Sequence, residues 1–347
     1  MYYLSRLFGL ALLGRGILAQ DIITAFTSGC SQLVLDRIDP LVSPGEEPSS
    51  HAHQIAGGNS FQSSMPPVRF DPASESTCTS CNYLEDASNY WTPLVYFQAR
   101  NGSFKRVPQK PPVGFDEYAS GTRIYYYGTY NDDRPTAFPK GFRMQYGNLA
   151  RHGIEKTSKF QGMGYQCVDM GEVQGAYTQH FPTTPCQYGI VTSVWFPPCW
   201  DGVRVDSDDH MSHMAFPSTG SIEDGAPCPE SHPVQVPHMY LDSIWDTSEF
   251  NDPELWPEDP EKQPFVLSNG DSTGYDFYAS FLNGWKDGAL ERALAEFGTE
   301  CDMRALDSCL GFNQQNRTDS AACTKKPVID EDLGGWLDEL PGGVQVY

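Results

Sequence analysis

Basic residues are scarce in this chain, which has 23 lysines and arginines against 45 aspartates and glutamates, a formal net charge of −22. Nucleic acids and anionic membranes are bound through a basic surface that this composition does not supply. The charge therefore argues against both as partners. A neutral partner such as a glycan fits the charge better.

Long apolar runs are also missing after the N-terminal segment. No later stretch reaches the ~18 continuous apolar residues of a membrane span. The first residues contain Arg6, a mostly apolar run over 7–13, and Ile17-Leu18-Ala19 ahead of Gln20, although Arg15 interrupts the apolar region. This pattern is typical of a secretory signal peptide cleaved after Ala19. We expect a signal peptide over residues 1–19 and a secreted, extracellular mature protein without a membrane anchor.

An unpaired cysteine is not expected, because the ten cysteines are an even number and all follow the predicted cleavage point. In an exported chain this count predicts up to five disulfides. Cys78-Thr79-Ser80-Cys81 has no second CxxC to complete a four-thiolate zinc site, so a zinc-thiolate site is disfavoured. Asn101-Gly102-Ser103 and Asn316-Arg317-Thr318 match the N-glycosylation pattern, which predicts an exposed position for both and a glycoprotein.

Helix signals are few, whereas short β-branched or aromatic runs alternate with proline, glycine and asparagine. The 347 residues, 39% of them apolar, can bury one large core. We predict a mostly β fold, a jelly-roll-like β-sandwich with long disulfide-pinned loops and few short helices. The expected organisation is one β-rich domain over residues 20–325 and an acidic C-terminal tail over 326–347. The clearest predicted strands lie at 94–97, 123–127, 190–196 and 265–267.

Three local features complete the predicted fold. Asn101-Gly102, between aromatic residues, predicts a hairpin turn. The clearest helix begins with Asp287 as the N-cap, carries Leu290, Ala293, Leu294 and Phe297 at helical spacing, and stops at Gly298. The tail either packs back through Trp336 or frays.

Two histidine pairs are the main chemical signal. His51 and His53 are two residues apart beside the glycine turn Gly57-Gly58, so on a strand their side chains share a face. His210 and His213 form a second pair. Such imidazoles suit a metal site or a proton-transfer pocket, and the simpler interpretation is structural hydrogen bonding. We predict His51, His53 and His213 as ligands of a divalent metal, Zn or Cu, if a metal is bound.

Several familiar chemistries are excluded by missing residues. A cupin needs a glutamate shortly after its HxH pair, and residues 54–61 contain none. A copper monooxygenase with an N-terminal histidine conflicts with Gln20 at the predicted mature terminus. Gly270-Asp271-Ser272-Thr273-Gly274 matches a nucleophile elbow, but that mechanism needs a later histidine and the last one is His238. A chymotrypsin-like order has little support, because the segment around His51 does not resemble that family.

Carboxylates and indole rings complete the candidate site. Hydrolysis of a glycosidic bond needs two carboxyl groups about 5 to 9 Å apart. We predict Asp208 and Asp271 in this role, with His210 as a third catalytic group; the alternative for each aspartate is turn and cap hydrogen bonding. We predict stacking of sugar rings on the indoles of Trp91, Trp200 and Trp285, although rings in a β-sandwich also serve as core.

Nine blocks stand out by their content and their order along the chain: residues 36–45, 51–59, 78–91, 141–144, 196–202, 208–213, 228–233, 268–275 and 283–285. Together they resemble the fungal secreted "domain of unknown function 1996" family over most of the mature chain. The resemblance implies membership and no activity, because the family's name leaves its activity unassigned. It also implies a histidine and an aspartate two residues apart after Gly270-Asp271, where this chain has Tyr278 and Ser280.

Two functions are compatible with these observations. The first is a secreted carbohydrate-active protein, a hydrolase of a polysaccharide or cell-wall glycan with a His/Asp pocket, acting as a monomer. The second is a non-catalytic protein that binds a cell-wall glycan, with a degenerate metal site. Activity on a set of polysaccharides, with and without EDTA, distinguishes them.

Overall fold

Antiparallel strands make up most of the structure, as the short β-branched and aromatic runs predict. The computed structural model describes residues 21–111, 121–128, 134–147, 162–169, 172–220, 226–259, 261–286 and 288–347. The predicted signal segment lies outside these ranges. Within them, the prediction of a mostly β fold with few short helices is confirmed. The four predicted strands are present as β5 (Val95–Gln98), β8 (Gly121–Tyr127), β12 (Gly189–Trp195) and β17 (Phe265–Leu267).

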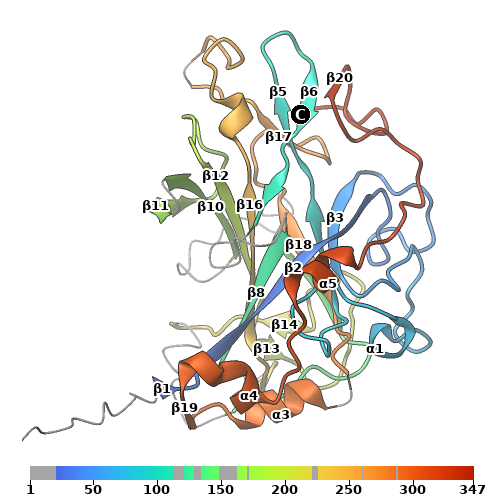
Figure 1. The fold of residues 1–347 in the computed structure, drawn as a ribbon, viewed down its shortest axis with the longest axis vertical. Coiled ribbons are helices and arrows are strands. Elements are labelled where there is room, and N and C mark those ends of the chain that lie inside the picture. Colours follow the sequence, from blue (N-terminus) through green and yellow to red (C-terminus); the bar gives the residue numbers. More distant parts are fainter. Residues whose placement is uncertain are drawn as a thin grey trace, which may run out of the picture.

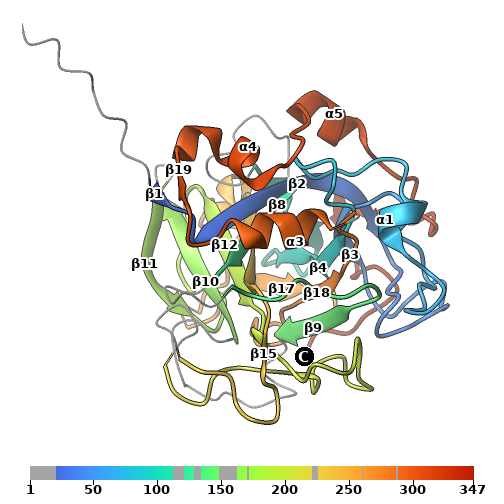
Figure 2. The ribbon, with the colours of Figure 1, turned by 90° about the horizontal axis from the view of Figure 1, so that it is seen from below.

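One large sheet curls around the main core. Its strand β2 (Ala25–Asp36) joins two halves, because the first part of β2 pairs with β8 and the last part with β3 (His53–Gly57). The register of β2 shifts between Gln32 and Val34, a bulge that bends a strand. Figure 2 shows β2 crossing the molecule from the β8 side to the β3 side. The strands, in order across the sheet, are β11 (Glu172–Thr178), β10 (Gly162–Asp169), β12 (Gly189–Trp195), β16 (His238–Trp245), β8 (Gly121–Tyr127), β2 (Ala25–Asp36), β3 (His53–Gly57), β4 (Asn89–Pro93), β18 (Tyr278–Leu282) and β9 (Arg143–Gly147), and β7 (Gln109–Lys110) pairs with β16.

Three smaller sheets carry the remaining strands. The predicted hairpin at Asn101-Gly102 is confirmed, since β5 and β6 pair across it and Gly102 adopts a φ of +90° that favours glycine. The four-stranded sheet has the order β17 (Phe265–Leu267), β5 (Val95–Gln98), β6 (Phe104–Arg106) and β20 (Trp336–Leu337). The others are β14 (Met214–Ala215), β13 (Cys199–Trp200) and β15 (Val234–Gln235), and β1 (Asp21–Ile22) with β19 (Glu300–Cys301).

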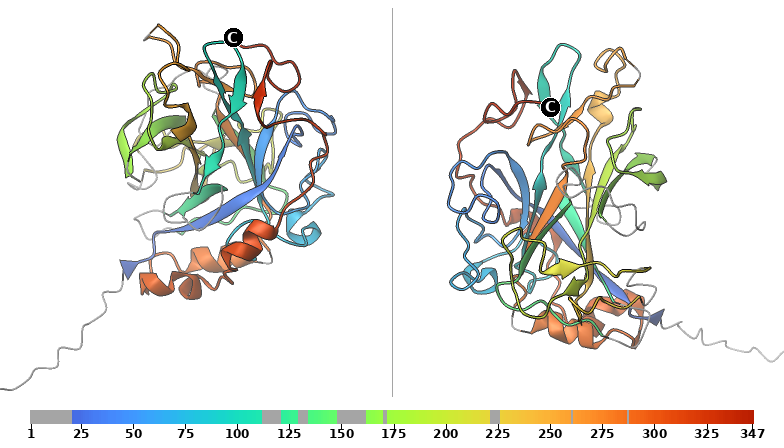
Figure 3. Two further views of the ribbon diagram at one scale, coloured as in Figure 1. Left: turned by 45° about the horizontal axis from the view of Figure 1, so that its top comes forward. Right: turned by 180° about the vertical axis from the view of Figure 1, so that it is seen from behind.

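Helices are short and lie mainly near one end. The predicted helix is confirmed as α3 (Ala289–Ala295), which buries Leu290, Ala293 and Leu294 on one face; Asp287, the predicted N-cap, lies outside the described residues. Helices α3 and α4 lie at the end opposite the β5–β6 hairpin (Figures 1 and 3). No helix of the described ranges is long and apolar enough to cross a membrane. The other helical elements are α1 (Pro72–Glu75), η1 (Ser248–Phe250), η2 (Met303–Ala305), α4 (Leu306–Leu310) and α5 (Arg317–Ala322).

Both faces of the β3–β4–β18 part of the sheet are buried, because successive residues of a strand point to opposite faces. Tyr90 and Phe281 pack into the main core, whereas Trp91 and Leu282 pack into a second cluster on the other face. The second cluster also contains Ile38 and Leu41, which precede β3, and Phe61 and Met65, which follow it. This face of the sheet also carries the candidate site.

All ten cysteines are paired, which confirms the prediction of five disulfides. The pairs link cysteines 30 and 81, 78 and 323, 167 and 186, 199 and 228, and 301 and 309. Asn101 and Asn316 of the two glycosylation patterns are exposed, as expected for acceptors.

The acidic tail packs back onto the domain rather than fraying. The backbone N–H groups of Val328 and Ile329 donate to the Asp36 carboxylate at 2.6 and 3.2 Å. Trp336 lies in β20, which extends the four-stranded sheet, and the Lys105 ammonium lies 5.7 Å from its ring centroid. The tail then continues to the loop after β17, next to the candidate site.

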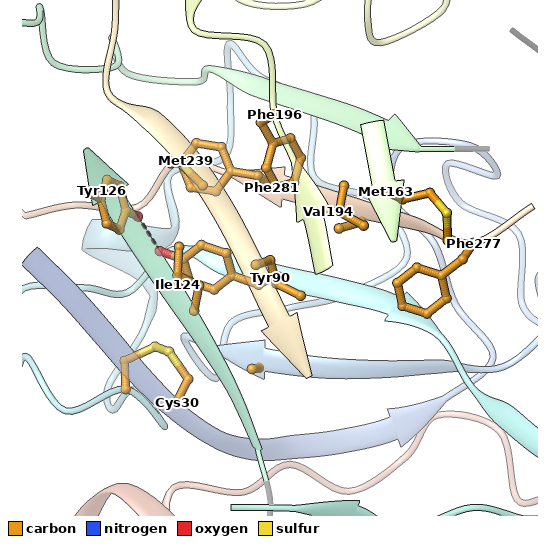
Figure 4. Packing of buried hydrophobic residues seen from close by; sticks show 14 of the residues in the cluster. Cys30, Tyr90, Ile124, Tyr126, Met163, Val194, Phe196, Met239, Phe277 and Phe281 are labelled. Carbon is orange, nitrogen blue, oxygen red and sulfur yellow. Dashed lines mark hydrogen bonds between the residues drawn. A yellow bond between two sulfur atoms is a disulfide. The ribbon is translucent and has the colours of Figure 1, made fainter. Parts of the chain in front are cut away.

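A buried carboxylate is held in the main core by hydroxyl groups. Asp86 accepts hydrogen bonds from Ser28 at 2.7 Å and from Tyr90 at 3.1 Å. The Tyr90 hydroxyl lies 2.6 Å from that of Tyr126, as Figure 4 shows, and Trp285 donates to Tyr126 at 3.1 Å. Burial, only partly offset by these hydrogen bonds, raises the pKa of Asp86 to about 6.

The raised pKa of Asp86 predicts an unusual pH dependence of stability. The folded protein retains a proton on Asp86 that the unfolded chain has released, so this contribution is complete below pH 3.8 and is lost as the pH rises through about 6. We expect the free energy of unfolding of the wild type, relative to Asp86→Asn, to fall by about 2 kcal/mol between pH 4 and pH 7. Urea unfolding of both proteins measures this difference, and a pH-independent difference would contradict the assignment. The ¹³C shift of the Asp86 carboxyl gives a second measurement on the wild type.

Candidate active site

The Tyr278 hydroxyl lies between two imidazoles on the outer face of the sheet. Tyr278 begins β18 and His53 begins β3, so the two strands bring together residues 225 positions apart. The hydroxyl oxygen is 2.8 Å from Nε2 of His51 and 2.8 Å from Nε2 of His53. The three side chains are buried, with 8% of His51, none of His53 and 4% of Tyr278 exposed.

Asp39 lies behind His53, with Oδ2 of Asp39 3.5 Å from Nε2 of His53. The other oxygen, Oδ1, accepts the N–H groups of Leu41 at 2.9 Å and Val42 at 3.0 Å. Burial raises the pKa of Asp39 and lowers the pKa of His53 to about 3. His53 is therefore neutral at physiological pH, and despite the short distance the two groups do not form an ion pair.

A neutral His53 constrains the hydrogen bonds of the phenol. A hydroxyl has one proton, so Tyr278 donates to one imidazole and accepts from the other. Ser50 Oγ lies 2.9 Å from Nδ1 of His51, the second ring nitrogen of that histidine. The arrangement is a hydrogen-bonded chain of Ser50, His51, Tyr278 and His53 that can pass a proton to a bound molecule.

A pocket of about 330 Å³ opens beside this chain. Most of its wall consists of polar side chains, and among the described residues Asp276 contributes the only side-chain carboxylate of that wall. Such a mixture of hydrogen-bond donors and acceptors suits a ligand with several hydroxyl groups. The pocket is lined by Val42, Ser50, His51, Gln145, Asn269, Asp276, Tyr278, Val344 and Tyr347.

His210 lies near this site but contacts a different group. Its Nδ1 is 2.7 Å from Oδ1 of Asp206, and its carbonyl accepts the N–H of Gln145 at 2.9 Å. Burial lowers the pKa of His210, but the Asp206 carboxylate, the Leu41 backbone and Asp39 outweigh burial, so the pKa is raised. His210 thus supports two parts of the pocket wall, the segment after Asp39 and the strand that carries Gln145.

The other predicted histidine has structural contacts, and the predicted carboxylate Asp208 lies in an exposed turn. Both ring nitrogens of His213 are engaged, one 2.8 Å from Ser207 Oγ and the other 2.9 Å from the Arg143 carbonyl. Asp208 is exposed, and its neighbour Asp209 forms the turn by accepting two backbone N–H groups. His213 therefore has no free nitrogen for the predicted metal.

Asp271 shapes the pocket from behind. It is buried, and its oxygens accept the N–H and hydroxyl of Thr273 and the N–H of Asp276. These bonds correspond to the alternative interpretation of this residue, a turn carboxylate. Asp271 fixes the loop on which Asp276 reaches the pocket.

The predicted stacking residues differ in exposure. Trp91 is 1% exposed and packs against Phe61, and Trp285 is 8% exposed beside Phe312, so their burial leaves neither ring face open to a sugar. Trp200 is partly exposed and donates its indole N–H to the Arg204 carbonyl at 2.6 Å. Of the three, Trp200 alone is compatible with surface stacking.

The described residues contain one group of three closely spaced ligand types, Cys30, Cys81 and Asp86, and its sulfurs form a disulfide. At the pocket, the groups available to a metal are the imidazoles of His51 and His53 and the Tyr278 phenol. Ser280, the second departure from the implied family pattern, accepts a hydrogen bond from Gln145 at 3.1 Å. A serine hydroxyl is a weaker ligand than the implied aspartate.

Sequence reasoning did not identify Asp39 as a partner of His53, nor most of the residues that line the pocket. Asp39, Gln145 and Asp276 reach the site from separate segments, and Val344 and Tyr347 come from the tail. Asp39 lies within the block 36–45 that resembles the family, and Asp276 directly follows the block 268–275. This position in the sequence is the signal that could have identified the two residues.

Comparison with known proteins gives one result. No curated protein and no solved structure matches the chain. The sequence model of one family, described as "Domain of unknown function (DUF1996)", matches residues 39–285. This span contains Asp39, both imidazoles, Tyr278 and Asp276, and it ends before the tail that completes the pocket wall. Because the match covers well over half of the sequence, the chain belongs to the DUF1996 family.

Proposed function

We propose that this protein is a secreted carbohydrate-active enzyme, a hydrolase that cleaves a glycosidic bond of a polysaccharide or cell-wall glycan in the pocket beside Tyr278. The observation that carries the proposal is the Tyr278 hydroxyl held 2.8 Å from two imidazole nitrogens, at the wall of a pocket rich in hydrogen-bonding side chains. The five disulfides support an oxidising, extracellular location.

The proposed chemistry divides the proton transfers between two walls of the pocket. Tyr278, hydrogen-bonded to His51 and His53, donates a proton to the leaving glycosidic oxygen. Asp276 accepts a proton from water, whose oxygen bonds to the anomeric carbon as the bond to the leaving oxygen breaks. The proton on Asp276 returns to Tyr278 through solvent and the hydrogen-bonded chain, which restores the site.

The second candidate is a non-catalytic glycan-binding protein. It is favoured by a specific observation: one carboxylate lines the pocket, whereas most glycoside hydrolases use two. Of the two predicted catalytic carboxylates, Asp208 is exposed and Asp271 is engaged in a turn. Binding by the same polar wall without cleavage would then be the function.

Incubation with a set of neutral and acidic polysaccharides tests both candidates. We expect new reducing ends from at least one neutral glycan between pH 4 and pH 7. The same reactions with EDTA test whether cleavage requires a metal. The two imidazoles and the phenol are ligand types that Zn or Cu accepts. Calorimetric binding without new reducing ends would support the second candidate, and neither binding nor cleavage would overturn both.

A further inference from the structure

The tail segment Gly342–Tyr347 forms one wall of the proposed active site. Leu340, just before it, is fully buried with Ala52 and Leu94. The segment then crosses the loop after β17, where the Tyr347 N–H donates to the Gly270 carbonyl at 3.0 Å. Ser272 donates to the Tyr347 carbonyl from its N–H at 3.2 Å and its hydroxyl at 2.7 Å.

Glycine is needed where the segment meets this loop. Gly270 has a φ of +96°, and a Cβ there would lie 2.2 Å from the carbonyl oxygen of Gln345. Any other residue would therefore push the segment away from the loop. The close fit joins the tail to the loop that carries Asp276.

Tyr347 also contacts the carboxylate that lines the pocket. Its hydroxyl donates to Oδ2 of Asp276 at 2.6 Å. Asp276 is 7% exposed, and its Oδ1 is buried without a hydrogen-bond partner among the described residues. An unpaired buried carboxylate oxygen costs free energy that a hydroxyl donor, from water or a bound sugar, would recover.

We propose that the segment Gly342–Tyr347 closes one end of the pocket and that Tyr347 positions Asp276, so that the site accepts the end of a glycan chain rather than its interior. The inference rests on the proposed function. A volume of about 330 Å³ is near the lower limit for ligand pockets, which suits a terminal sugar unit. Val344 and Tyr347 occupy the wall through which a longer chain would continue.

The activity test compares the wild type with a chain that ends after Leu340, on a glycan that the wild type cleaves. We expect the wild type to release short products from chain ends with little loss of viscosity, and the truncated chain to cut internally, with a several-fold larger viscosity loss for each new reducing end. Val346→Ala is the control, since this side chain faces a neighbouring surface pocket. Internal cleavage by the wild type would overturn the inference and leave the proposed function standing.

The positioning role of Tyr347 has its own measurement. Tyr347→Phe retains the wall and removes the hydrogen bond to Asp276. We expect kcat to fall several-fold with KM nearly unchanged, the acidic side of the kcat–pH profile, which depends on the proton acceptor, to shift, and products still to come from chain ends. An unchanged kcat and pH profile would overturn the positioning role.

A chemical probe tests closure without any activity. Diethyl pyrocarbonate modifies accessible imidazoles, and His51 lines the pocket whereas His232 is partly exposed and does not belong to the pocket lining. We expect truncation to raise the modification rate of His51 several-fold and to leave that of His232 unchanged. If the wild type cleaves no glycan, the proposed function fails, but the modification rate of His51 still tests whether the segment Gly342–Tyr347 closes the pocket. Equal His51 rates in the wild type and the truncated chain would overturn the closure.

Discussion

Tyr278→Phe is expected to lower kcat by about 10²- to 10⁴-fold, the usual contribution of a positioned general acid. The substitution removes one hydroxyl and keeps the ring. That hydroxyl links His51 to His53 at 2.8 Å on each side. Without it, the leaving oxygen has no proton donor at this wall. Initial rates on the best glycan, together with a thermal unfolding curve, measure the effect.

Tyr96→Phe is the matched control for that variant. Tyr96, in β5 of the four-stranded sheet, is fully buried in a cluster with Ala52, and its hydroxyl has no hydrogen-bond partner among the described residues. Removing it should leave kcat unchanged and alter the free energy of unfolding by about 1 kcal/mol or less. A Tyr278→Phe protein that folds normally and keeps wild-type kcat would exclude the proposed proton donor.

The strands were predictable because their signals are local. Alternating or continuous apolar runs bounded by turn residues identified β8, β12 and β17, and Asn101-Gly102 identified the hairpin. The connection of these strands into one curled sheet was not predictable in detail. It depends on pairings such as β18 with β4, which join segments far apart in the sequence.

The site was predictable only in part, for the same physical reason. The spacing of His51 and His53 predicts that the two side chains share one face of a strand. Their common hydrogen-bond partner, Tyr278, lies more than 220 positions away in the sequence. In the sequence, Tyr278 is a departure from the implied family pattern, and nothing local marks it as the hydrogen-bonding centre. The local signal of aspartate beside glycine does not separate a turn residue such as Asp271 from a pocket residue such as Asp276.

The pairing of the cysteines was also not predictable from the sequence, and this pairing determines how much each disulfide stabilises the fold. Ten cysteines predicted five bonds, but their partners depend on the fold. Cys78 and Cys323 are 245 residues apart, and Cys301 and Cys309 are 8 apart. A crosslink restricts the unfolded chain more when it closes a longer loop, so these two bonds should differ in their contribution to stability.

Replacing Cys78 and Cys323 with alanine is expected to lower the free energy of unfolding by as much as about 5 kcal/mol, against about 2.5 kcal/mol for the pair at 301 and 309. The chain-entropy estimate for the long loop is an upper value, because the bond between Cys30 and Cys81 already restricts part of the same unfolded chain. Urea unfolding of both double variants measures the difference, and a larger loss from the short loop would contradict this ranking.

The bond between Cys78 and Cys323 also has a consequence at the active site. Cys323 ends α5 and packs into the second core cluster, and the tail that forms the pocket wall follows it. Two residues later, Lys325 donates its N–H to the Leu33 carbonyl at 3.1 Å. Loss of the disulfide should loosen this anchor before the domain unfolds, because local opening costs less than global unfolding. We therefore expect the Cys78→Ala, Cys323→Ala protein to show faster modification of His51 in the folded state, whereas the variant at 301 and 309 should retain wild-type protection.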